Sequence, residues 1–140
     1  GNYLTMIFSP LITKTFKNEA LAAKLGYEIF QKLEKYNKKF SDKIRFNIGI
    51  NSGELIASKE KGKLKYTSIG NTIRLTQKLA NSANNKILIT ENIRKKLMRS
   101  LKVKEAGVVG KTKIYSIEKL TDTEANREKL KELLRRMEQD

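Results

Sequence analysis

The stretch that decides the fold is YTSIGNTIRLTQKL, residues 66–79. It begins with residues typical of a strand, breaks at Gly70-Asn71, and continues with apolar residues at helical spacing. On the expected helix, Arg74 and Lys78 stand one turn apart on the same face. The stretch therefore predicts a strand, a turn and a helix that presents two cations close to the turn, where a ligand has room to sit.

The sequence on either side predicts a mixed domain of helices and strands. Residues 18–38 have the spacing of an amphipathic helix, with Leu21, Leu25, Ile29 and Leu33 four apart, and residues 44–50 alternate like a half-buried strand. The other expected elements are a strand over 3–8, a hairpin formed by 54–57 and 64–69, a helix over 72–84, a strand over 86–90, a short helix over 91–99 capped by Thr90, and a closing hairpin formed by 101–109 and 113–117.

Composition excludes several kinds of chemistry. The chain has 140 residues, enough for one domain with a core, and it contains no cysteine and no histidine. Disulfides, thiolate chemistry, the usual zinc sites and imidazole catalysis are therefore ruled out. The sequence shows neither a membrane span nor a signal peptide, so we expect a cytoplasmic location.

The net charge of +15 attracts phosphates in general. It lies in residues 1–120, because residues 121–140 hold five basic and six acidic side chains. The simplest interpretation is a solvated surface rich in lysine, and the alternative is a functional anionic partner. Nucleic acid is an unlikely partner, since the lysines are scattered and no aromatic ladder accompanies them.

The last twenty residues predict a separate amphipathic helix. Thr121 and Glu124 form a capping-box pattern. One narrow apolar stripe follows, made of Leu130, Leu133, Leu134 and Met137. Such a stripe docks on its own domain or on a partner helix, and we expect it to matter more for assembly than for the fold.

Three motifs in order resemble the class III adenylate/guanylate cyclase homology domain. They are IGINSG at 48–53, the opening stretch at 66–79, and ILIT at 87–90. The resemblance covers residues 1–120, leaving 121–140 as a C-terminal helix. It implies an α+β fold: a largely antiparallel sheet with helices packed on one face, a palm or ferredoxin-like core that lacks its opening strand.

The positions that carry the family's chemistry are altered. Such enzymes cyclise ATP or GTP with two metal ions held by two aspartates. One aspartate belongs to the opening strand, which has no counterpart here, and Asn2 stands at the other. Arg74 replaces the asparagine that orients the ribose, and Lys78 replaces the arginine that stabilises the transition state. We therefore expect no catalytic residues and no metal ligands, and Thr67, at the base-selecting position, joins Arg74 and Lys78 as nucleotide-binding candidates.

The leading hypothesis is a non-catalytic cyclase homology module that acts in signalling by dimerisation, by nucleotide binding or by binding a partner. One alternative is a half-site of an adenylate or guanylate cyclase, which would use Mg²⁺ or Mn²⁺ only if residues upstream or on a partner complete the site. Another is a basic nucleic-acid-binding domain. The family's pairing implies a homo-oligomer or a polypeptide that supplies the missing strand; otherwise no cofactor is expected.

Overall fold

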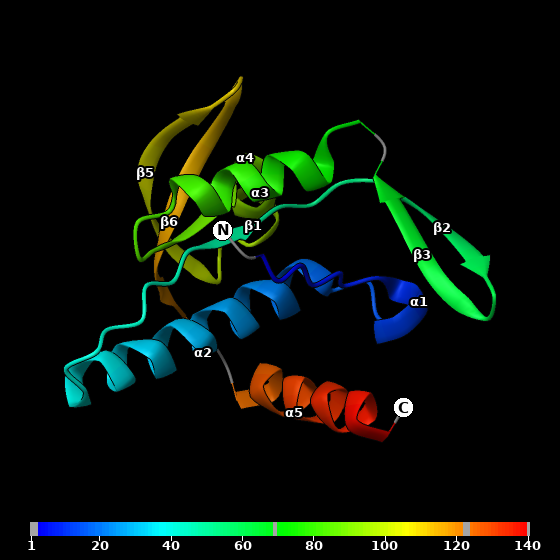
Figure 1. Cartoon of the computed structure of the whole chain (residues 1–140), viewed down its shortest axis with the longest axis horizontal. Coiled ribbons are helices and arrows are strands. Elements are labelled where there is room, and N and C mark those ends of the chain that lie inside the picture. The colour runs from blue at the N-terminus through cyan, green and yellow to red at the C-terminus, as the bar shows by residue number, and fades with distance from the viewer. Residues whose placement is uncertain (1–2, 69, 122–123, 140) are drawn as a thin grey trace.

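The computed structural model describes residues 3–68, 70–121 and 124–139. The elements in chain order are α1 (Pro10–Thr13), α2 (Asn18–Lys39), β1 (Ile48–Ile50), β2 (Leu55–Glu60), β3 (Lys63–Ser68), α3 (Thr72–Ser82), β4 (Ile87–Thr90), α4 (Glu91–Lys96), β5 (Leu101–Val109), β6 (Thr112–Leu120) and α5 (Glu124–Gln139). In this part of the chain the main sheet has the strand order β1-β4-β6-β5, and β2 and β3 form a hairpin of their own (Figure 1).

The expected α+β class and the largely antiparallel sheet are confirmed. Strand β4 pairs with β6 in antiparallel fashion and with β1 in parallel, and β5 pairs with β6 in antiparallel fashion. All four residues of β4 are buried, which places this strand at the centre of the domain. The motif ILIT is therefore the core of the sheet.

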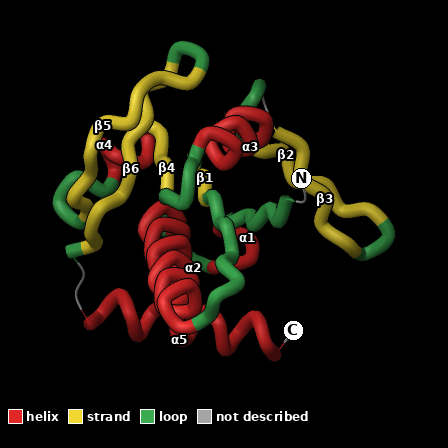
Figure 2. Tube along the Cα trace, turned by 60° about the vertical axis from the view of Figure 1, so that its left-hand side comes forward, coloured by secondary structure: helices red, strands yellow, loops and turns green. Residues whose placement is uncertain are grey.

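Helices cover both faces of this sheet, where the sequence suggested one face. Ile87 and Ile89 of β4 join the core cluster that contains Ala23 of α2, whereas Leu88 joins the cluster that contains Leu79 of α3. Successive side chains of a strand point to opposite faces, so a run of apolar residues without alternation has a helix on each side. Figure 2 shows α2 and α3 apart from each other, with β1 and β4 between them.

Two glycines let these helices approach the sheet closely. A Cβ atom at Gly49 would lie 2.7 Å from both the Thr76 carbonyl oxygen and the Ala80 backbone nitrogen of α3. A Cβ at Gly26 of α2 would lie 3.2 Å from the end of the Ile50 side chain. Helix α3 therefore packs directly on the backbone of β1.

Two expected strands differ from the structure. Residues 3–9 have no regular secondary structure, since no strand of the described part pairs with them. The strand expected over 44–50 is reduced to Ile48–Ile50. The reason lies in Asn85, just before β4, where a positive φ of 55° turns the chain away from residues 44–47. The Asn85 side chain accepts the Phe46 N–H, which therefore has no strand partner.

The buried side of α2 also differs from the expected leucine stripe. Ala23 and Gly26 are buried against the sheet, and Phe30 packs edge-on against Phe46 with ring centroids 5.1 Å apart. Of the four expected positions, Leu21 is buried on another side of the helix and Ile29 is exposed. The sheet therefore takes the small and aromatic residues of α2, which leaves Leu21 for a different partner.

That partner is α5. Leu133 is buried against Leu21 and Phe8, so α5 docks on its own domain through this residue, while Leu134 and Met137 stay exposed. The Thr121 hydroxyl donates to the Arg99 carbonyl, and the capping box expected over 121–124 involves residues 122 and 123, which lie outside the described part. The side chain of Leu130, the remaining residue of the expected stripe, lies outside the described part.

No helix in the described ranges is both long enough and apolar enough to cross a membrane.

We expect Gly49→Ala to destabilise the domain by about 1–3 kcal/mol, because the added methyl group meets backbone atoms of α3 that cannot move independently. Gly26→Ala is the matched control: its methyl group meets the flexible end of a side chain, and alanine favours the helix. Urea unfolding followed by circular dichroism measures both. A loss of stability in Gly26→Ala equal to that in Gly49→Ala would contradict the close approach of α3 to β1.

Candidate functional site

The start of α3 is fixed by the side chain of Asn51, which follows β1. Its amide nitrogen donates to the Thr72 carbonyl of α3 at 3.2 Å, and its amide oxygen accepts from the Thr90 hydroxyl of β4 at 3.0 Å. Thr90 is the N-cap residue of α4, as the sequence suggested, but its side chain makes no capping hydrogen bond to that helix. A Cβ atom at Gly53 would collide with the Thr72 side chain, so this turn too lies against α3.

A cavity of about 320 Å³ opens between α3 and the turn that joins β5 to β6. Arg74 and Lys78 line it from α3, and Lys111 lines it from the turn. The other lining residues are Asn71, Leu75, Val109, Gly110 and Thr112. The structure thus brings together the two cations predicted from the sequence and adds a third from a segment more than thirty residues away.

The third cation, Lys111, sits on a two-residue hairpin loop. Val109 pairs with Thr112, and Gly110 has a φ of 63° while Lys111 is not among the residues with positive φ. This combination matches a type II′ turn, which has glycine at its first central position. Lys111 was not among the site residues predicted from the sequence. The Gly-Lys pair between two apolar strands was the available signal for a turn that carries a cation.

The chemistry of the cavity favours anions. Three cationic side chains line it, and none of its lining residues is acidic. The backbone N–H groups at the start of α3 add a partial positive charge, since Asn71 and Arg74 lie in the first turn. All three cations are exposed, so their attraction for an anion is screened by salt.

A pair of divalent metal ions does not fit this cavity. Such ions require carboxylate oxygens, and the cavity offers one amide side chain, one hydroxyl and three positive charges. Across the described ranges, no three acidic side chains gather in a metal-binding group. Asn2, which stands at the position of a metal aspartate, lies outside the described residues.

The third nucleotide-binding candidate, Thr67, is not brought into this cavity. It lies on β3, is exposed, and pairs with Ile56 of the hairpin. Its neighbour Tyr66 is half-buried. The cavity therefore collects Arg74 and Lys78, the two cationic positions of the predicted site, and leaves out the base-selecting one.

The strongest pKa shift lies away from the cavity, at α4. The Arg94 guanidinium bonds Glu91 at 2.7 Å and, with the Tyr115 hydroxyl, lowers the pKa of this carboxyl to about 2. Arg94 also stacks over the Tyr115 ring, 4.8 Å from its centroid. At Glu19, partial burial raises the pKa, but hydrogen bonds from Lys96 and Ser52 outweigh it and the pKa is lowered. Both groups tie α4 to its neighbours and have a structural role.

The fold and the cavity define a mixed α+β domain with a cationic cavity at the start of a helix. The family model described as the adenylate and guanylate cyclase catalytic domain matches residues 3–123. Because the match spans most of its length, the chain belongs to this family. A search of curated protein sequences finds no significant match.

Two solved structures have a similar fold. One is the dimeric guanylyl cyclase domain of the RhoGC fusion protein from the aquatic fungus Blastocladiella emersonii, with a TM-score of 0.56 and 19% identity over 71% of this chain and 60% of that one. The other is the adenylyl cyclase CyaB from P. aeruginosa, with a TM-score of 0.55 and 17% identity over 79% of this chain and 64% of that one. This chain thus spans less than two thirds of each.

We expect the stability of the domain to fall as the pH drops from about 4.5 towards 2, partly because of Glu91. Its pKa is lower in the folded than in the unfolded state, so unfolding takes up a proton and becomes easier in acid. Glu91→Gln should flatten this part of the pH profile, measured by urea unfolding. Glu118→Gln is the control, an exposed carboxyl on β6 without an ion pair in the described part. Equal slopes in Glu91→Gln and the unmodified chain would contradict this role.

Proposed function

We propose that this chain is a non-catalytic nucleotide cyclase homology module that binds the phosphate groups of a nucleotide. The single observation that supports the proposal is the convergence of Arg74, Lys78 and Lys111 on one cavity at the start of α3. Phosphate oxygens are the natural partners of such a group, since guanidinium and ammonium groups each donate charge-assisted hydrogen bonds to them. The ligand is ATP or GTP, and the role is signalling.

The same residues argue against catalysis. Cyclisation by this family needs two metal ions, and the cavity has positive charges where metal ions need carboxylates. Lys78 supplies charge without the planar fork of an arginine, and Arg74 is a long cation where a small amide orients the ribose in the family. The module therefore retains attraction for phosphates and lacks the means to activate a ribose hydroxyl.

We further propose that the chain acts as a homodimer or with a polypeptide that pairs with the edge of its sheet. Strand β1 is an edge strand in the described part, paired with β4 alone. An unpaired edge is a template for another strand. Leu4 and Phe16, in the N-terminal segment, are 89% and 90% exposed, which is costly for an isolated copy.

For nucleotide binding we expect Arg74→Ala, Lys78→Ala and Lys111→Ala each to weaken ATP and GTP about tenfold at low salt, equivalent to about 1.4 kcal/mol. Calorimetric titration measures the affinity. The control is Lys102→Ala, an exposed lysine on β5 outside the cavity. Unchanged affinity in the triple alanine variant would overturn the site.

A titration with duplex DNA tests the alternative partner. Tight binding at about 0.15 M salt that is lost in the triple variant Lys59→Glu, Lys61→Glu and Lys63→Glu would favour nucleic acid instead.

For catalysis we expect no cyclic nucleotide from ATP or GTP with Mg²⁺ or Mn²⁺, measured by chromatography of the products. Restoring the family residues together, as Asn2→Asp, Arg74→Asn and Lys78→Arg, should produce none either, since one carboxylate is still lacking. Product formed by the unmodified chain and abolished in Lys78→Ala would show that the chain is the half-site of a working cyclase.

For assembly we expect sedimentation to show a species larger than one chain at micromolar concentration. Leu4→Asp combined with Phe16→Asp should shift it towards the monomer, because each change places a charge on an exposed apolar position. Lys32→Asp on α2 is the control for added negative charge. A monomer at all concentrations would remove the homodimer from the proposal and leave a different polypeptide as the partner.

A further inference from the structure

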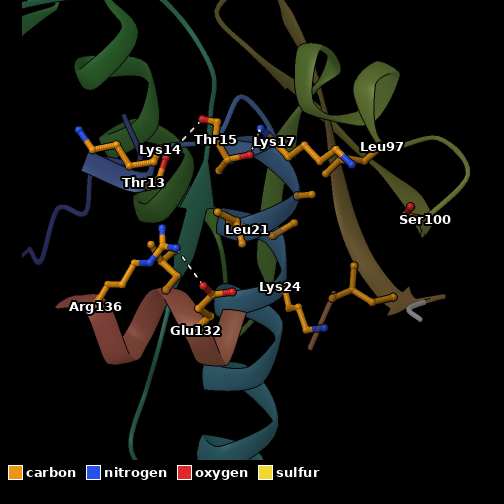
Figure 3. A pocket seen from close by; sticks show the side chains of 14 residues that line it. Thr13, Lys14, Thr15, Lys17, Leu21, Lys24, Leu97, Ser100, Glu132 and Arg136 are labelled. Carbon is orange, nitrogen blue, oxygen red and sulfur yellow. Dashed lines mark hydrogen bonds and ion pairs between the residues drawn. The ribbon is translucent and has the colours of Figure 1, made fainter. Parts of the chain in front are cut away.

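A second cavity, of about 210 Å³, lies beside the first turns of α2. The end of α1, the segment between α4 and β5, the end of β6 and α5 form its other walls (Figure 3). The described residues that line it differ from those that line the cavity at α3. The nucleotide proposal therefore leaves this cavity unexplained.

The walls of this cavity are mainly apolar. Leu21, Leu97, Leu120 and Leu133 line it, together with two alanines of α2. An apolar cavity of about 150 Å³ holds a benzene molecule. This larger one therefore has room for the phenyl ring and the methylene group of a phenylalanine side chain. Such an occupant would bury the apolar surface of the walls, which is favourable in water.

One phenylalanine of this chain lies at the edge of the cavity without entering it. Phe16 stands between Thr15 and Lys17, and both of these neighbours line the cavity. Its own side chain is 90% exposed, so the ring extends into solvent. The backbone at residue 16 is therefore part of the edge of the cavity, and its ring is free to enter a cavity on another molecule.

The elements around the cavity expose further apolar side chains. Leu11 and Ile12 are exposed on α1, which borders the cavity through Thr13. On α5, Met137 follows Leu133 by one turn and is half exposed. Contiguous exposed apolar surface of this kind is typical of an interaction site.

The distribution of charge favours the same face for contact between two copies. The chain carries a net charge of +15, so two copies repel each other. Residues 121–140 hold five basic and six acidic side chains, and within them Glu132 pairs with Arg136 at 2.9 Å. Repulsion between copies is therefore weakest where α5 faces the partner.

The rim of the cavity accepts an aromatic ring. Lys14, Lys17 and Arg136 line it, and Figure 3 shows the two lysines before and at the start of α2 and Arg136 on α5. The face of an aromatic ring attracts cations. These side chains therefore favour a phenyl ring over an aliphatic side chain as the occupant.

We propose that a second copy of this chain docks on this face, with the Phe16 ring of each copy in the cavity of the other. This interface rests on the homodimer proposed above. Because residue 16 lies at the edge of its own cavity, a twofold axis near that edge places each ring at the mouth of the opposite cavity. Two aromatic anchors then form together, and the exposed apolar residues of α1 and α5 surround them.

The dissociation constant of the dimer tests this interface, measured by sedimentation of the full chain at a salt concentration that screens the repulsion. Phe16→Ala should raise it about hundredfold, because two anchors are lost in each dimer. Ala20→Phe fills the cavity from α2 and should raise it as much. Val108→Ala is the control, a truncation of an exposed apolar residue on β5 outside the cavity, and should leave it unchanged.

A mixture of the two variants gives the sharpest measurement. The Phe16→Ala copy keeps its cavity and the Ala20→Phe copy keeps its ring, so a mixed dimer retains one of the two contacts. Neither variant alone retains any. The mixture should therefore associate about tenfold more tightly than either variant by itself, if the two contacts are additive. Since Phe16 is exposed, Phe16→Ala remains informative even where Ala20→Phe does not fold.

The outcomes separate this interface from the homodimer itself. A dimer with an unchanged dissociation constant in Phe16→Ala would overturn the interface and leave the homodimer to form elsewhere. A monomer at every concentration would overturn both. A lower melting temperature of monomeric Phe16→Ala, with no association in the mixture, would show that each ring occupies its own cavity and would overturn the interface as well.

Discussion

The contact between α3 and β1 is the constraint on which the rest of the structure depends. Position 49 has no room for a side chain, because the backbone of α3 occupies the space that a Cβ atom would take. This close approach sets the height of α3 above the sheet, and the hydrogen bonds of Asn51 to Thr72 and Thr90 hold the start of the helix in place. The position of Arg74 and Lys78 follows from these contacts.

Arg74 and Lys78 form one wall of the cationic cavity, and the wall that faces them has a different origin. The β5–β6 hairpin is held by its ladder to β4 and ends in a two-residue loop. A short loop of this type has few conformations, so Lys111 starts from a well-defined backbone position. Two rigid elements thus face each other, each carrying cations, and the repulsion between these like charges is offset by the stability of the sheet and helix that carry them.

The sequence predicted most of the elements because their patterns are local. The helix at 18–39, the turn at Gly70-Asn71 and the buried strand at 87–90 each have a distinct period or composition, and each is present. Strand pairing depends on distant neighbours, which explains the two differences. Residues 3–9 have strand-like composition but no partner in the described part, and residues 44–47 lose their partner where the chain turns at Asn85.

The candidate site was predicted in part for the same reason. Arg74 and Lys78 share one helix face, so their proximity follows from helical geometry alone. Lys111 meets them only because β6 lies beside β4 and β4 lies beneath α3, and no local pattern contains that information. The same applies to α5, whose amphipathic character was evident while its partner, Leu21, was assigned to a different stripe.

Strand β4 has a further consequence, since it separates the cavity at α3 from the face of the sheet that α2 covers. Its side chains alternate between the cluster under α2 and the cluster under α3, and it pairs with strands on both sides. A thermodynamic coupling between two sites requires an element with two arrangements that both ligands bias. A fully buried central strand is the element least able to supply a second arrangement. A ligand in the cavity at α3 should therefore leave the packing under α2 unchanged, so that the two faces of the sheet respond independently of each other.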